Sequence, residues 1–79
     1  MTNSISQNLL EELVKEVERG VNKYGNYSSL DEGRLVIQTE FNEMDEAIDL
    51  DYIRDIRDEA LQVAATAIRF VYEIDRGLK

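Results

Sequence analysis

The chain has 79 residues, contains no cysteine, histidine or proline, and carries a formal net charge of −8. This length allows one small domain, expected over residues 1–79, and the missing residue types exclude disulfide bonds and histidine-based catalysis. The negative charge disfavours binding to nucleic-acid backbones and to anionic membranes. We expect a cytoplasmic protein, because the sequence contains neither a membrane-spanning run nor a signal-peptide pattern.

The first helix is predicted to follow a cap at Asn3 or Ser4 and to run for about five turns. Gly25 is suited to the left-handed conformation that ends it. The apolar residues recur at intervals of three and four, which is typical of an amphipathic helix: Leu9, Leu10, Leu13, Val14, Val17, Val21 and Tyr24.

The second helix is predicted over residues 30–48. Ser29 is suited to cap it, and Glu32 is placed to reach back to the cap. Gly33 lies inside the first turn and lowers helix stability there. Two readings are open: another part of the chain approaches Gly33 closely, or the glycine is tolerated near a frayed end.

The third helix is predicted to begin after a turn at residues 49–51, which also supplies its cap, and to continue almost to the end of the chain. Its apolar stripe is interpreted as a packing seam: Ile53, Ile56, Ala60, Val63, Ala64, Ala67, Val71 and Ile74. No segment shows the alternation of a strand, so the fold class is all-α with three helices. Because so short a chain has little core, we expect a homo-oligomer, specifically a dimer with a four-helix core.

A metal site is predicted from the acidic centre of the chain, where residues 31–59 carry eleven acidic residues and three arginines. Glu40 and Glu43 share one helix face, and Glu59 with Gln62 does so on the next helix. Oxygen ligands of this kind suit Mg²⁺ or Mn²⁺. The competing interpretation is a set of solvated surface charges, with Arg54 or Arg57 as the counter-charge.

A family resemblance adds to this interpretation. The sequence from Lys23 to Phe70 resembles the small MazG-like proteins of the all-α nucleotide pyrophosphohydrolase superfamily, particularly the short phage and prophage versions. Four segments carry the resemblance in order: Lys23-Tyr24-Gly25, then Glu32-Gly33-Arg34-Leu35-Val36-Ile37, then Glu40-Phe41-Asn42-Glu43, and last the stretch from Glu59 to Phe70.

The resemblance implies hydrolysis of nucleoside triphosphates to monophosphate and pyrophosphate with Mg²⁺ or Mn²⁺. It assigns the metal ligands to Glu40, Glu43, Glu59 and Gln62. Gln62 replaces a family aspartate, and Thr39 replaces a glutamate found in many relatives, so both remove negative charge. The alternative is a protein that binds nucleotides without turnover, or a helical interaction module.

Three further roles complete the hypothesis. Glu43 is the candidate for activating the attacking water. Arg69 is a candidate for the phosphate tail, with a surface ion pair to Glu73 as the alternative. Tyr24, and Tyr27 near it, are candidates for stacking on a base, with packing beside a helix end as the alternative.

Overall fold

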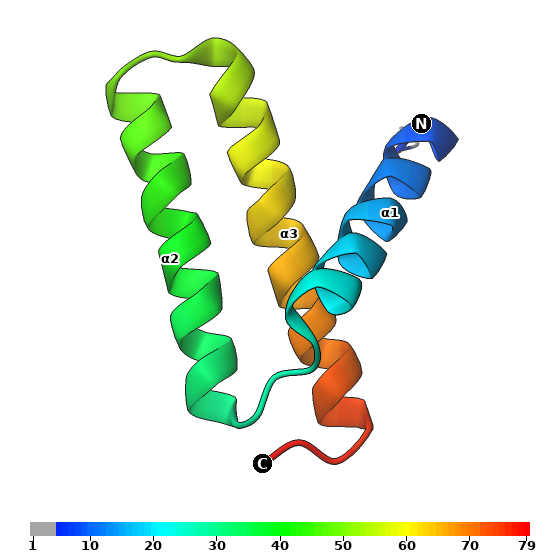
Figure 1. The fold of residues 1–79 in the computed structure, drawn as a ribbon. Helices are drawn as coiled ribbons and strands as arrows, with labels where there is room; N and C mark the ends of the chain where they lie inside the picture. Colours follow the sequence, from blue (N-terminus) through cyan, green and yellow to red (C-terminus); the bar gives the residue numbers. More distant parts are fainter. Residues whose placement is uncertain (1–4) are drawn as a thin grey trace.

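The computed structural model describes residues 5–79, and these residues form three helices with no strand among them. The helices are α1 (Gln7–Tyr24), α2 (Leu30–Asp49) and α3 (Ile53–Asp75). Figure 1 shows α3 in the middle, with α2 on one side and α1 on the other. No helix among the described residues has the length and apolar content needed to cross a membrane. The predicted all-α class is therefore confirmed.

The first helix begins later than predicted. Its cap is Ser6, whose hydroxyl accepts a hydrogen bond from the Leu9 amide at 3.1 Å. The predicted caps, Asn3 and Ser4, lie outside the described residues. The helix ends as expected at Gly25, which has a positive φ of 77° and donates its amide to the Val21 carbonyl. Glycine adopts this φ without steric cost.

The second helix begins at the predicted cap. The Ser29 hydroxyl accepts a hydrogen bond from the Glu32 amide at 3.0 Å. The Glu32 carboxylate reaches back one residue further than a capping box requires, because it accepts from both the amide and the hydroxyl of Ser28. These bonds fix the loop that joins α1 to α2.

The turn before α3 differs from the prediction. Tyr52 occupies the cap position, and no side chain caps the helix. Asp51 instead adopts a left-handed conformation with φ of 59°, and the amides of Asp51 and Tyr52 bond to carbonyls at the end of α2. Aspartate tolerates this conformation better than most residues, so its role is to reverse the chain and not to cap.

A close contact between α2 and α3 explains Gly33. A Cβ atom at this position would lie 2.4 Å from the Phe70 ring, which is closer than two non-bonded carbon atoms can approach. Tyr27 packs edge-on against the same Phe70 ring, with 6.1 Å between the two ring centroids. Tyr27 is buried and donates its hydroxyl to the Thr66 carbonyl at 3.0 Å. Of the two readings of Gly33 left open by the sequence, the close approach is the one that the structure shows.

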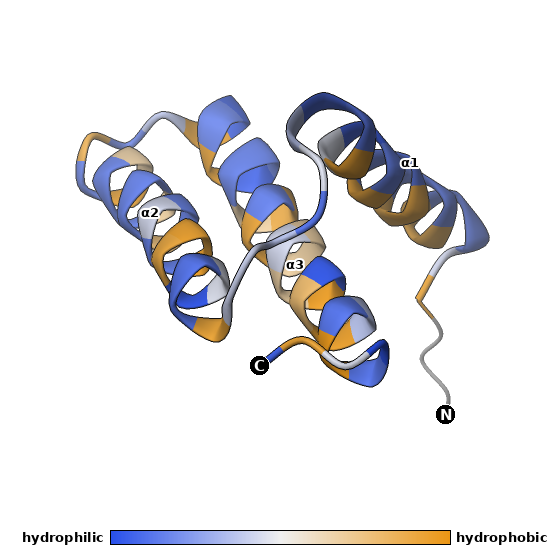
Figure 2. Ribbon diagram, turned by 60° about the horizontal axis from the view of Figure 1, so that its bottom comes forward, coloured by the Kyte–Doolittle hydropathy of each residue, from blue (hydrophilic) through white to orange (hydrophobic). Residues whose placement is uncertain are grey.

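The apolar stripe of α3 is only partly covered within the chain, where Ile56, Val63 and Ala67 are half-buried. The side of α3 that faces the other helices buries Ala65, Thr66, Arg69 and Glu73, whereas Val71 and Ile74 are exposed. Figure 2 shows hydrophobic residues along one side of α1 and hydrophobic segments along α2 and α3. Much of the apolar surface therefore remains uncovered in a single chain.

Gly33→Ala is expected to lower the free energy of unfolding by about 1–3 kcal/mol, because the added methyl group displaces the Phe70 ring. The loss should exceed the gain in helix propensity, which is about 1 kcal/mol. Asn42→Ala, at an exposed position of the same helix, is the matched control and should stabilise slightly. Urea unfolding of both variants measures the difference. Equal stabilisation by the two alanines would contradict the contact.

Candidate metal centre

Three carboxylates converge between α2 and α3. Glu40 and Glu43 come from successive positions on one face of α2, and Glu59 comes from the facing side of α3. One oxygen atom of each lies within 4.8 Å of the others. We refer to these residues as the carboxylate triad. The structure thus brings together the three acidic ligands that the sequence analysis selected.

The triad disfavours its own ionisation. Burial raises the pKa of Glu40, and the neighbouring Glu43 carboxylate raises it further. Burial also raises the pKa of Glu59, and the proximity of Glu43, Glu40 and Asp55 adds to the effect, so that this pKa reaches about 7. Carboxylates share protons in this way when no cation lies between them.

The arginines near the triad do not neutralise it. Arg57 forms a bidentate ion pair with Glu12 of α1, with N–O distances of 2.8 and 2.9 Å. The ion pairs among residues 5–79 do not include Arg54. Arg19 favours ionisation of Glu40, but the same arginine is paired with Glu16 at 2.8 Å.

The triad fits a hard divalent cation. Glu59 Oε2 is buried and has no hydrogen-bond partner among the described residues. Leaving such an oxygen unsatisfied is costly, and a bound cation would satisfy it. The donors are all oxygen atoms, the set preferred by Mg²⁺ and Mn²⁺.

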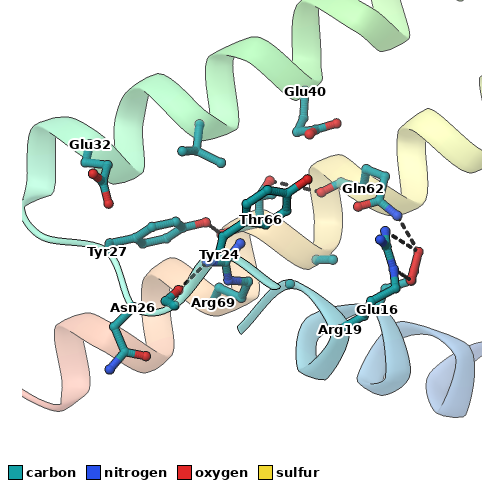
Figure 3. Close-up of a pocket in the computed structure, with 14 residues that line it drawn as sticks. Glu16, Arg19, Tyr24, Asn26, Tyr27, Glu32, Glu40, Gln62, Thr66 and Arg69 are labelled. Atoms are coloured by element: carbon teal, nitrogen blue, oxygen red, sulfur yellow. Dashed lines mark hydrogen bonds and ion pairs between the residues drawn. The ribbon is translucent and has the colours of Figure 1, made fainter. Parts of the chain in front are cut away.

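Gln62 lies next to the triad and is held from α1. Its amide nitrogen donates a short hydrogen bond to Glu16 Oε1, as Figure 3 shows. A carboxylate can only accept, so the NH₂ group of Gln62 must face Glu16. The amide oxygen is left for another partner. The sequence analysis predicts that this oxygen is a neutral metal ligand. The orientation of the amide is compatible with that prediction.

A cavity of about 320 Å³ adjoins the triad, at the lower end of the sizes typical of small-molecule sites. All three helices and the loop after α1 line it. Glu40 and Gln62 line both this cavity and the open depression around the triad, so the two spaces are neighbours. A ligand in the cavity would therefore lie beside Glu40, one of the triad carboxylates.

Arg19 and Tyr24 also line both spaces. The Tyr24 side chain is 69% exposed, so its ring is available to a ligand, as the sequence analysis proposed. Arg19 was not selected from the sequence. The sequence shows only that Arg19 lies about one helical turn after Glu16, a spacing that predicts an ion pair between them. It does not show that this side of α1 lies near the acidic residues of α2.

Arg69 and Tyr27 have structural partners. The guanidinium of Arg69 donates to the Gly25 carbonyl at 2.9 Å and lies 4.5 Å from the centre of the Tyr27 ring. Gly20 leaves room for it, because a Cβ there would lie 3.0 Å from the guanidinium. The ion pairs of the described residues do not include the alternative with Glu73. Arg69 lines the cavity, and a role in phosphate binding remains a prediction.

In comparisons with known proteins, no family model, no curated protein and no solved structure matches the chain. The functional argument therefore rests on the geometry of the site and on the sequence resemblance.

The free energy of unfolding is expected to fall as the pH rises from about 4.5 to 7. Glu59 binds a proton more tightly in the folded chain than in the unfolded one, so its contribution is complete below pH 4.5 and is lost as the pH passes 7. With allowance for solvent screening, we expect a loss of about 1 kcal/mol that Glu59→Gln removes. Urea unfolding at several pH values, without divalent cations, measures it.

Glu18→Gln is the matched control, since it removes one carboxylate from the exposed side of α1 and should leave the pH dependence unchanged. The same pH dependence in wild type and Glu59→Gln would contradict the assignment of the raised pKa to this residue.

Proposed function

We propose that the protein is a Mg²⁺- or Mn²⁺-dependent nucleoside triphosphate pyrophosphohydrolase of the MazG-like type, acting in the cytoplasm as a homo-oligomer. The observation that carries this proposal is the carboxylate triad, with its unpartnered buried Glu59 oxygen, beside a cavity that Glu40 also lines. The sequence resemblance supplies the reaction, and a short phage-type member is the form it favours.

In this proposal Glu40, Glu59 and the amide oxygen of Gln62 hold the cation together with Glu43. When bound, the cation supplies positive charge for a triphosphate and acidifies water. Glu43 is the most exposed of the three triad carboxylates, and is therefore the one we assign to accepting the proton of the attacking water. The water oxygen bonds to the α-phosphorus, the bond to the bridging oxygen breaks, and pyrophosphate leaves with the electron pair.

The remaining residues position the substrate. Tyr24 and the cavity receive the base, because an exposed aromatic ring at the rim of a cavity offers a stacking surface. Arg19 lies where the cavity meets the triad, and its guanidinium supplies charge-assisted hydrogen bonds to a phosphate passing that point. Binding there would require Arg19 to share or exchange its present partner, Glu16.

Two polar contacts favour a second function, namely nucleotide binding without cleavage. The Gln62 amide is tied to Glu16, and the Thr39 hydroxyl donates to the Leu35 carbonyl of its own helix at 2.8 Å. Neither position adds negative charge to the triad. A protein that holds nucleotides without cleaving them keeps the same cavity and triad but binds the cation more weakly. A helical interaction module would need neither.

A pyrophosphate-release assay over a panel of nucleoside triphosphates, with Mg²⁺ and with Mn²⁺, tests the two functions. Gln62→Asp restores the missing ligand charge but sets a second carboxylate against Glu16. The double variant Glu16→Gln/Gln62→Asp keeps one amide and one carboxylate at this contact, so it is the cleaner test. We expect the double variant to release pyrophosphate about tenfold or more faster than wild type.

Glu16→Gln alone is the matched control, since it removes a carboxylate without adding a ligand to the triad. No turnover by any variant, together with nucleotide binding by calorimetry, would leave the binding function. No turnover and no binding would contradict both, and only the interaction module would remain.

A further inference from the structure

The turn that joins α2 to α3 exposes a cluster of large apolar side chains. We call residues 48–53 the hairpin tip, and Figure 1 shows it at the opposite end of the α2–α3 pair from the C-terminus. Four of its six side chains are large, apolar and exposed: Ile48 at 49%, Leu50 at 50%, Tyr52 at 55% and Ile53 at 74%. Turns between helices are normally polar. A cluster of exposed apolar side chains on one short turn is typical of a contact surface.

The hairpin tip also lies in the most negative part of the chain. Residues 43–59 contain eight acidic residues and two arginines, so they hold −6 of the net charge of −8. Arg57 is already paired with a residue of α1, and the ion pairs among residues 5–79 do not include Arg54. The last turn of α2 contains Glu46 and Asp49 but no basic residue, although a helix C-terminus favours positive charge. Positive charge brought to the tip would therefore stabilise the folded chain.

An open depression of about 220 Å³ lies beside the tip. It is smaller than the roughly 300 Å³ at which small-molecule sites begin, so it suits a single long side chain. Leu50 and Tyr52 form an apolar part of its wall, and no basic residue of the described chain lines it. The charged part of the wall consists of four carboxylates: Glu43, Glu46, Asp55 and Glu59.

This wall matches the two parts of a lysine or arginine side chain. The aliphatic stem of such a side chain packs against apolar surface, while its charged head group stays among polar groups. Leu50 and the Tyr52 ring offer the apolar surface, and the ring also attracts a cation. The carboxylates receive the head group. Glu59 Oε2, which is buried without a hydrogen-bond partner among residues 5–79, is an acceptor still to be satisfied.

The charge of the tip identifies the occupant. A second copy of the chain would bring another tip of charge −6 against this one, and like charges repel. Nucleic acid and anionic membrane are repelled in the same way. A basic segment is attracted along the whole tip, and its own apolar residues can cover Ile48 and Ile53. The surface therefore fits a partner that is both basic and amphipathic.

We propose that the hairpin tip docks a basic amphipathic segment of another protein. The segment seats one lysine or arginine side chain in the depression and packs apolar side chains on Ile48 and Ile53. This docking needs neither a metal nor a nucleotide at the carboxylate triad. Because Glu43 and Glu59 belong both to the depression and to the triad, an inserted basic side chain competes with a cation for the same carboxylates.

A labelled model peptide made only of leucine and lysine, spaced to form an amphipathic helix, is the probe. The full chain is titrated into it at physiological salt, without divalent cations or nucleotide, and fluorescence anisotropy measures binding. We expect a micromolar Kd, and a several-fold higher Kd for a lysine-only peptide of equal charge. In wild type, the amide chemical shifts that change on binding should be concentrated in residues 46–55.

Two substitutions separate the charge from the apolar contact. Glu46→Gln removes a carboxylate of the depression that is not part of the triad, and Ile53→Ser removes exposed apolar surface at constant charge. Each should raise the Kd about threefold to tenfold. The matched controls are Glu18→Gln, on the exposed side of α1, and Leu35→Ser, which is 61% exposed and about 20 Å from Ile48 along α2. Neither control should change the Kd.

Four results would each overturn the proposal. They are no binding of the leucine–lysine peptide, equal affinity for the lysine-only peptide, shift changes centred outside residues 46–55, and equal effects of Glu46→Gln and Glu18→Gln. The shift measurement uses wild type, so it decides even if a variant fails to fold. Because no cation or nucleotide is present, none of these results bears on the proposed pyrophosphohydrolase activity.

Discussion

Mutual repulsion among three carboxylates at the junction of α2 and α3 is the constraint around which the site is arranged. Burial and proximity raise the pKa of Glu40 and carry that of Glu59 to about 7. Arg19 offsets this repulsion at Glu40 only in part, because it is paired with Glu16, and Arg57 is paired with Glu12. The carboxylates lie in an open depression between α2 and α3, so this repulsion persists in the folded chain.

The first helix acts on this site through polar contacts. Glu16 holds the amide of Gln62, Glu12 holds Arg57, and Gly25 accepts from Arg69. Together these contacts hold α1 against α3, although the buried residue of α1 is the small Gly20. They also bear on the site: the NH₂ group of Gln62 is engaged by Glu16, and Arg57 is held by Glu12. Changes on α1 should therefore alter the surroundings of the triad even though α1 supplies none of its carboxylates.

Local signals predicted the helices and the triad well. The cap at Ser29, the glycine at position 25 and the three-residue spacing of Glu40 and Glu43 each depend on neighbours within one turn. The close approach at Gly33 was suggested by the helix cost of glycine, but its cause, Phe70, lies 37 residues further along the chain. Arg19 was missed and the structural partners of Arg69 were not foreseen, because both depend on how α1 is seated. Periodicity also could not tell whether the α3 stripe packs within one chain or against another.

The most direct measurement of the central claim is the melting temperature of wild type and Glu40→Gln, each with and without millimolar Mg²⁺. Removing one carboxylate should raise the melting temperature in the absence of metal, by roughly 4–8 °C if about 1 kcal/mol of repulsion is relieved. In wild type, Mg²⁺ should raise the melting temperature because it binds the folded chain, and Glu40→Gln should lose most of that response. If the two proteins melt alike with and without Mg²⁺, the triad is a cluster of surface charges and the metal site is contradicted.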